Sequence, residues 1–158
     1  MKRALVITAS DRVNEGVRED TSGIGVGARL EALGFTVQRA VLPDERKALT
    51  DVLRASAETH DLIVTTGGTG LTPRDVTPQA TRDAIDYEIP GLAEAMRAAG
   101  RLSTPHADLS RGVVGVIGRA LVINLPGSPK GALESLVAIE AVFDHALETL
   151  AGPFDHDA

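Results

Sequence analysis

The stretch of sequence that decides the fold runs from Leu62 to Asp75 and reads LIVTTGGTGLTPRD. Its first residues are aliphatic and largely β-branched, which is typical of a buried strand. Three glycines at positions 67, 68 and 70 then let the backbone turn sharply or approach a ligand closely. Thr77-Pro78 follows and predicts a helix start. A glycine-rich turn between a strand and a helix is where α/β proteins hold phosphate groups, although such turns also serve as plain connectors.

Outside this stretch, apolar runs and turn signals predict alternating strands and helices. We expect strands at 4–8, 35–42, 62–66, 113–117 and 121–125, and helices at 21–34, 45–59, 77–86, 90–100 and 132–150. A charged surface loop is expected at 10–20, irregular chain at 104–112 and a C-terminal tail at 151–158.

This order predicts one α/β domain over residues 1–150. Its architecture is a three-layer Rossmann-like fold with right-handed crossovers and a mostly parallel central sheet. The last two strands are joined by only three residues, Gly118 to Ala120, which favours an antiparallel hairpin. One edge strand is therefore expected to be antiparallel.

The composition excludes several classes of protein. A net charge of −6, 3% aromatic residues and no tryptophan argue against nucleic-acid binding. The absence of cysteine excludes disulfides, thiolate zinc sites and cysteine nucleophiles. The apolar run near the N-terminus is too short for a signal peptide, and no stretch approaches the length that spans a membrane. We expect a cytoplasmic protein that meets anionic substrates with local cations, backbone N–H groups or a metal.

Polar side chains follow three of the predicted parallel strands. Because such strands open on the same edge of a sheet, Ser10, Asp44 and Asp75 are expected to converge. Asp75 is either a metal-binding carboxylate or the ion-pair partner of Arg74, and Mg²⁺ is the natural ion beside phosphates. Taken alone, Asp44 is better explained as a helix cap, a role that does not exclude catalysis.

Two further loops are candidates for binding. The segment from Pro126 to Gly131 combines prolines, glycines, a serine and a lysine, so it suits a nucleotide or a rigid turn equally well. Ser110-Arg111 offers a hydroxyl and a cation, although a surface salt bridge explains the arginine as well.

Other motifs fail on spacing. No Gly-Lys-Ser/Thr follows the first glycine loop, so it is not a Walker A loop. The glycines at 23, 25 and 27 invite a dinucleotide-binding interpretation, but a charged loop separates them from the first strand. Close packing of a helix on the sheet explains them better. The four histidines show no metal-ligand spacing.

Several of these segments, in the same order, resemble the signatures of the molybdenum cofactor biosynthesis family. The long run 65–81 and the second loop 124–130 carry the resemblance, supported by 7–11, 19–23, Pro43-Asp44 and 109–111. The likeness spans residues 2–150 and is to the stand-alone molybdopterin adenylyltransferase branch. Gly131 stands where relatives tend to carry alanine.

The resemblance implies Mg²⁺-dependent transfer of AMP from ATP to molybdopterin, with release of pyrophosphate. It implies Asp44 and Asp75 as catalytic and magnesium-binding residues. The implied nucleotide-binding residues are Gly67, Gly68, Thr69, Gly70, Gly127, Ser128, Pro129 and Lys130. The implied molybdopterin-binding residues are Ser10, Ser110 and Arg111.

The resemblance also implies assembly and partners. A homotrimer is expected, with a hexamer as the alternative, together with contact with the molybdate-insertion enzyme. No nucleic-acid or membrane partner is expected. The alternative function is that of a non-catalytic molybdopterin-binding paralogue in the same pathway.

Overall fold

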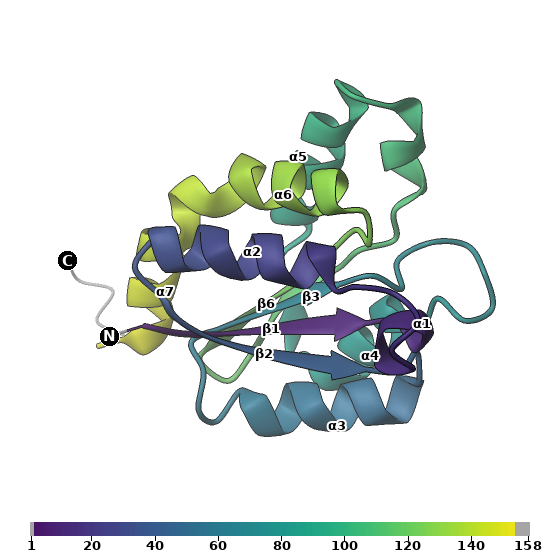
Figure 1. Ribbon diagram of the computed structural model, residues 1–158. Coiled ribbons are helices and arrows are strands. Elements are labelled where there is room, and N and C mark those ends of the chain that lie inside the picture. The colour runs from purple at the N-terminus through teal and green to yellow at the C-terminus, as the bar shows by residue number, and fades with distance from the viewer. Residues whose placement is uncertain (1, 154–158) are drawn as a thin grey trace.

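The computed structural model describes residues 2–153, which form a six-stranded sheet in the order β2-β1-β3-β6-β5-β4 (Figure 1). The strands are β1 (Arg3–Ala9), β2 (Thr36–Leu42), β3 (Leu62–Thr66), β4 (Tyr87–Glu88), β5 (Val114–Ile117) and β6 (Ala120–Leu125). The strands β2, β1, β3 and β6 are parallel, whereas β5 runs antiparallel to both β6 and β4. The mostly parallel sheet with an antiparallel edge is therefore confirmed. The strand β4 was not predicted, because it has only two residues and no apolar run.

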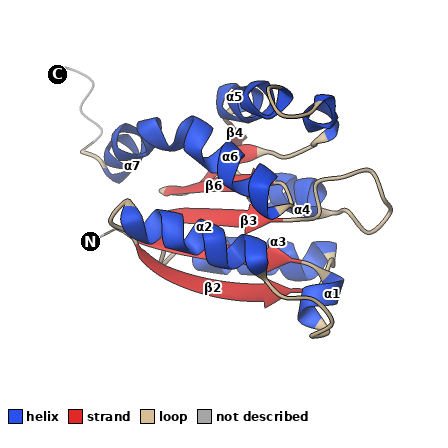
Figure 2. Ribbon diagram, turned by 45° about the horizontal axis from the view of Figure 1, so that its top comes forward, coloured by secondary structure: helices blue, strands red, loops and turns tan. Residues whose placement is uncertain are grey.

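Helices cover both faces of this sheet (Figure 2). Four of them, α2, α5, α6 and α7, share one apolar core with the sheet, and α3 and α4 share the other. Alternate residues of β1 supply the two cores, since Ala4 and Val6 face the first and Leu5 and Ile7 the second. The helices are α1 (Asp11–Asn14), α2 (Thr21–Ala32), α3 (Arg46–Ser56), α4 (Thr77–Ala84), α5 (Pro90–Arg101), α6 (Pro129–Ile139) and α7 (Phe143–Ala151), with 3₁₀ turns η1 (Pro105–Leu109) and η2 (Glu140–Val142). The three-layer architecture is confirmed.

Two local predictions about helix starts are wrong. The segment expected to be a plain loop at 10–20 contains the short helix α1. The helix α2 is capped by Asp20, whose carboxylate accepts a hydrogen bond from the Gly23 N–H at 3.0 Å, and not by Thr21 or Ser22. Both helices lie on the path from the end of β1 back to the sheet.

Asp44 does not cap α3, contrary to the prediction for that residue. The cap position is Glu45, and no side chain bonds the free N–H groups of this helix. The carboxylate of Asp44 accepts instead from the backbone N–H of Asp11, at 2.9 Å. The Asp44 side chain therefore bonds the segment that follows β1, at the edge of the sheet, and not the start of α3.

The helix expected at 132–150 is broken into α6, η2 and α7. No proline or glycine marks the break. Its position is set by contacts with distant parts of the chain, because Glu140 pairs with Arg29 of α2 and Phe143 packs edge-on against Phe35 with ring centroids 6.5 Å apart. The break thus follows from tertiary packing.

The end of the chain was expected to be a tail from residue 151. Ala151 is the last residue of α7, and residues 154–158 lie outside the described part of the chain. Among the described residues, no helix is both long and apolar enough to cross a bilayer.

Candidate active site

The backbone of the glycine loop after β3 packs closely against the end of β1. Gly67 and Gly68 have φ angles of +89° and +69°, in the left-handed region that side chains rarely adopt. A Cβ at Gly67 would lie 2.4 Å from the carbonyl oxygen of Ala9. Both the turn and the close approach therefore require glycine here.

The second loop, at 126–131, meets the first. A Cβ at Gly127 would lie 3.3 Å from the Cα of Gly67, and the Gly127 carbonyl accepts a hydrogen bond from the Ser22 hydroxyl at 2.5 Å. Ser128 caps α6, since its Oγ accepts from the Gly131 N–H at 3.1 Å. The N-termini of α2 and α6 therefore border the same space as the glycine loop, and helix N-termini favour anions.

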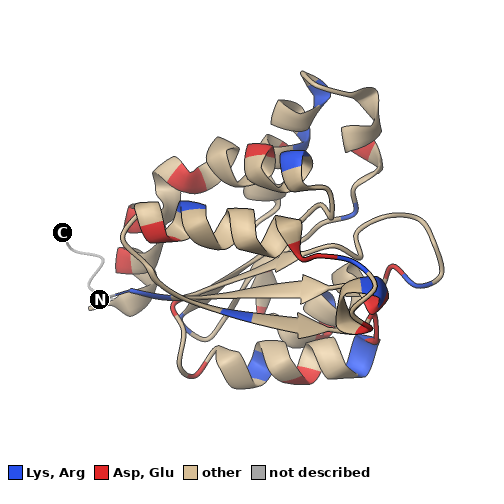
Figure 3. Ribbon diagram, viewed as in Figure 1, with Lys and Arg blue, Asp and Glu red and all other residues tan. Residues whose placement is uncertain are grey.

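These elements enclose a polar cavity of about 410 Å³ at the carboxyl edge of the sheet. Ser10, Asp44 and Asp75 all line it, so the predicted convergence of the strand-end residues is confirmed. Charges of both signs gather around this edge, over the segment between β1 and α2 (Figure 3). The other lining residues are Thr8, Ala9, Val13, Arg18, Glu19, Asp20, Thr21, Ser22, Thr66, Gly67, Gly68, Gly127, Ser128 and Pro129.

Asp44 and Asp11 hold each other in place at the cavity edge. Each carboxylate accepts a hydrogen bond from the other residue's backbone N–H, at 2.9 Å. Arg74 donates two hydrogen bonds of 2.9 Å to Asp11, so the arginine pairs with Asp11 and not with Asp75. Burial raises the pKa of Asp44, and the nearby charges of Asp11 and Asp75 raise it further, against the lowering effect of the Asp11 N–H.

Asp75 is anchored through one of its two oxygens. Its Oδ2 accepts from the backbone N–H and the hydroxyl of Thr72, at 2.9 and 2.8 Å. No described residue bonds Oδ1, which leaves this oxygen for a ligand. In Asp44 the oxygen Oδ1 is closed off from solvent and has no hydrogen-bond partner among the described residues, whereas Oδ2 accepts the bond from the Asp11 N–H.

This donor set suits a small hard cation. Within residues 2–153 there is no cluster of three His, Cys, Asp or Glu side chains that could hold a metal by themselves. Two carboxylates beside a phosphate-sized polar space match Mg²⁺, which commonly takes one or two carboxylates and completes its shell with phosphate oxygens and water. The residues present therefore fit magnesium.

A second, mostly apolar cavity of about 280 Å³ lies beside the first. Thr69, Gly70 and Ser110 line it, and Ser128 lines both cavities. Glu134 carries the only carboxylate of this lining, and it accepts a hydrogen bond from the Ser103 hydroxyl at 2.9 Å. The glycine loop therefore divides its residues between two cavities, with Gly67 and Gly68 in one and Thr69 and Gly70 in the other.

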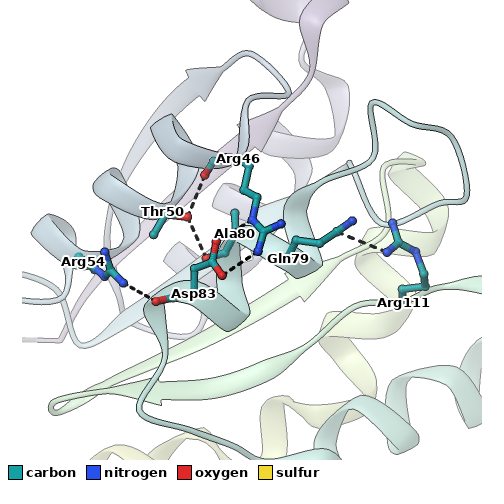
Figure 4. Close-up of polar contacts among 7 residues, drawn as sticks. All are labelled: Arg46, Thr50, Arg54, Gln79, Ala80, Asp83 and Arg111. Carbon is teal, nitrogen blue, oxygen red and sulfur yellow. Dashed lines mark hydrogen bonds and ion pairs between the residues drawn. The ribbon is translucent and has the colours of Figure 1, made fainter.

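Arg111 supports the glycine loop through hydrogen bonds to the loop's backbone carbonyls. Its guanidinium donates to the carbonyls of Gly70 and Asp75, at 2.9 and 2.8 Å, and its backbone N–H donates to Thr69. A further bond of 3.3 Å reaches Gln79 on α4 (Figure 4). Arg111 lines neither of the two cavities described above, although it borders a third with Ser110.

Lys130 lies outside both cavities. Its side chain is 80% exposed and its ammonium is 3.7 Å from Glu134. Of the residues that the resemblance assigns to the nucleotide, Thr69 and Gly70 line the apolar cavity instead of the polar one, and Lys130 lines neither.

Several residues of the polar cavity were not singled out from the sequence. Thr8 and Asp20 belong to it and bond each other at 2.8 Å, and Ser22 closes it against the second loop. The signal for Asp20 was present, because an acidic residue directly before a helix is a cap and lies at a helix N-terminus. Met96 and Glu134, in the second cavity, carry no local signal.

Over residues 5–146, the chain matches the family described as "Probable molybdopterin binding domain". The molybdopterin adenylyltransferase of Helicobacter pylori J99 is 36% identical over 156 residues, which cover 94% of this chain and 88% of that protein. Molybdenum cofactor synthesis protein cinnamon of Drosophila melanogaster is 37% identical over 92% of this chain, which spans 25% of that longer protein. The crystal structure of the molybdopterin biosynthesis enzyme MoaB from Thermus thermophilus superposes with a TM-score of 0.90 at 48% identity, covering 98% of this chain and 100% of that one.

Proposed function

The chain belongs to the family of molybdopterin-binding domains of molybdenum cofactor biosynthesis, and from this premise we propose that it transfers AMP from ATP to molybdopterin with the help of Mg²⁺. In this reaction a phosphate oxygen of molybdopterin attacks the α-phosphorus of ATP. The bond from that phosphorus to the bridging oxygen breaks, and pyrophosphate leaves with the electron pair. The product is adenylyl-molybdopterin.

The observation that carries the proposal is the meeting of two unlike cavities at Ser128. The polar cavity has the carboxylates, hydroxyls and helix N-termini that suit a triphosphate. The apolar cavity suits a flat heterocycle, and its single carboxylate, Glu134, is a natural acceptor for the amino and ring N–H donors of a pterin. Two substrates held on either side of the glycine loop would bring their phosphates together.

The chain's own residues would contribute positioning and charge. No protein nucleophile is required, because the attacking group belongs to the substrate, and alignment of the phosphates supplies much of the acceleration. Asp44 and Asp75 would hold magnesium, which neutralises phosphate charge when bound. The N–H groups at the starts of α2 and α6 would stabilise charge on the phosphates. Arg111 would act by keeping the glycine loop in shape.

The proposal extends to assembly and location. We propose a homotrimer, with a hexamer as the alternative, in the cytoplasm, with transfer of the product to the molybdate-insertion enzyme. Exposed apolar residues on the outer face of α6, Leu133 and Val137, support self-association. They lie four residues apart and so share one side of the helix.

The test of the activity is pyrophosphate release from MgATP in the presence of molybdopterin. Asp75→Asn keeps the shape of the side chain and an acceptor for Thr72, but it removes the charge. We expect turnover to fall on the order of 10²- to 10³-fold, because the variant would bind magnesium more weakly and so lose the cation that stabilises charge at the phosphates. The melting temperature should change little.

Asp86→Asn is the matched control. Asp86 also bonds a turn N–H, that of Gly118 at 2.8 Å, but it lines neither of the two cavities. We expect wild-type turnover for this variant. Wild-type protein that binds molybdopterin without releasing pyrophosphate would identify a non-catalytic paralogue, and full turnover by Asp75→Asn would exclude the role given to Asp75.

A further inference from the structure

Two side-chain atoms in the described part of the chain are buried and lack a hydrogen-bond partner: Oδ1 of Asp44 and Oγ1 of Thr77. Buried polar atoms are almost always bonded, because their desolvation is otherwise uncompensated. Thr77 is the first residue of α4 and is only 1% exposed. It lines neither cavity, and it does not cap its helix, since the cap position is Val76.

The two atoms lie against the same side of Gly68. A Cβ built on Gly68 would be 2.2 Å from Thr77 Oγ1 and 3.3 Å from Asp44 Oδ1. The hydroxyl therefore occupies the space that a side chain at position 68 would need, and the carboxylate oxygen borders that space. Because residue 68 is a glycine, no side chain stands between the Thr77 hydroxyl and the Asp44 carboxylate.

The two groups are chemically complementary. An ionised carboxylate only accepts hydrogen bonds, whereas a hydroxyl carries one donor. The hydroxyl of Thr77 bonds no backbone carbonyl, so its proton is available. The two atoms flank the space beside Gly68, so a hydrogen bond between them would satisfy both.

The backbones that carry both groups are already fixed. The Thr77 N–H donates to the Gly68 carbonyl at 3.2 Å, and the Asp44 N–H donates to Asp11 at 2.9 Å. The helix α4 is also fastened to α3, because Arg46 bonds Asp83 through two hydrogen bonds of 2.7 and 2.9 Å (Figure 4). Thr77 is thus held at a constant place beside Asp44.

We propose that Thr77 is a positioning residue whose hydroxyl donates a hydrogen bond to Oδ1 of Asp44. The Asp11 N–H already bonds Oδ2, so this second hydrogen bond would fix the carboxylate at both oxygens, at the edge of the polar cavity that Asp44 lines. The kinetic consequence rests on the proposed adenylyl transfer, whereas the hydrogen bond itself does not.

The hydrogen bond is tested without activity, by a double-mutant cycle in urea unfolding. In a wild-type background, Thr77→Val should lower the folding equilibrium constant about fivefold or more, and in an Asp44→Ala background by less than about twofold. The control pair is Thr50→Val with Asp44→Ala. Thr50 is also a buried threonine, but its hydroxyl bonds the carbonyls of Arg46 and Ala80, so additive effects are expected. Additive effects in the Thr77 cycle would overturn the hydrogen bond.

The positioning role is tested by kinetics of Thr77→Val and Thr77→Ser. Valine keeps the shape and removes the donor, so kcat should fall about 10- to 100-fold with the KM for ATP nearly unchanged. Serine keeps the donor and should restore kcat to within about threefold of wild type. Equal losses in both variants, or an unchanged kcat in Thr77→Val, would overturn the role. Wild-type protein without turnover would instead defeat the proposed function and leave the unfolding cycle as an independent result.

Discussion

At the scale of single residues, Gly68 combines two constraints that can be separated by experiment. Its φ of +69° is strained for any side chain, and a Cβ would also meet the Thr77 hydroxyl. We expect Gly68→Ala to lower the free energy of unfolding by about 2–4 kcal/mol, from backbone strain and overpacking together.

Gly118→Ala provides the reference for strain alone. Gly118 has a φ of +59° and nothing within 4 Å of its would-be Cβ. We expect a loss of only about 1 kcal/mol, measured by chemical denaturation. Equal losses at the two positions would mean that the contact between Gly68 and Thr77 has no energetic weight.

Asp44 has a pKa that burial raises, which makes stability depend on pH in an unusual direction for a carboxylate. In the window between the unfolded value, about 3.9, and the raised folded value, the folded protein binds more protons than the unfolded chain. Stability contributed by this group therefore decreases as the pH rises through that window. At neutral pH the buried charge is a cost.

Asp44→Asn removes that cost without changing the shape of the side chain. In metal-free buffer we expect the variant to have a higher denaturation midpoint than wild type at pH 7.5, and the difference to shrink at pH 4. Denaturation curves at both pH values measure this. A difference that grows toward low pH would contradict the raised pKa.

At the scale of elements, the glycine loop is shaped by a residue from another segment. The guanidinium of Arg111, just before β5, donates hydrogen bonds to two backbone carbonyls of this loop, those of Gly70 and Asp75. From the sequence, this arginine was expected to contact the substrate or to form a surface salt bridge. Its bonds are to backbone carbonyls of the loop, and they restrict the conformations open to a segment with three glycines.

Arg111→Lys keeps the charge but cannot reproduce a planar, multiple donor. We expect a loss of about 1–2 kcal/mol in unfolding free energy and faster hydrogen exchange of the Asp75 amide, which bonds Thr72 within the loop. Arg82→Lys is the control, because Arg82 makes an exposed pair with Glu88 and should change stability by less than about 0.5 kcal/mol. An unchanged hydrogen-exchange rate at the Asp75 amide would show that the Arg111 hydrogen bonds are not needed to order the glycine loop.

At the scale of the whole molecule, the proposed assembly rests on the outer face of α6. Val137 is 47% exposed and Leu133 is 40% exposed, on a helix whose inner face is fully packed. In light scattering the wild type should have about three times the 16.5 kDa mass of one chain.

Val137→Asp would place a charge in that face and should shift the mass toward the single chain, because an unpaired buried charge is strongly unfavourable. Val17→Asp, at another exposed apolar residue, between α1 and α2, should leave the mass unchanged. An unchanged mass for Val137→Asp would exclude this face as the interface.

Local sequence was sufficient for the layers and for part of the site. Period-two and helical patterns placed every strand longer than two residues, because each buries an apolar face or run that water disfavours. The glycines at 67, 68 and 127 marked both loops of the polar cavity, since the left-handed turn at Gly67 and Gly68 requires glycine and a Cβ at Gly127 would lie only 3.3 Å from Gly67. Parallel strands then implied that Ser10, Asp44 and Asp75 would meet.

Tertiary structure alone decided what those residues bond. Whether Asp44 caps α3 or faces Asp11, whether Arg74 pairs with Asp75 or Asp11, and where the C-terminal helix breaks all depend on groups at least 30 residues away in sequence. The same holds for Thr77, whose hydroxyl and the Asp44 carboxylate both lie against the face of Gly68 where a side chain would otherwise stand. Hydrophobic burial is non-directional and can be read as a pattern along the chain, whereas a hydrogen bond depends on distances and angles that exist only after the chain has folded.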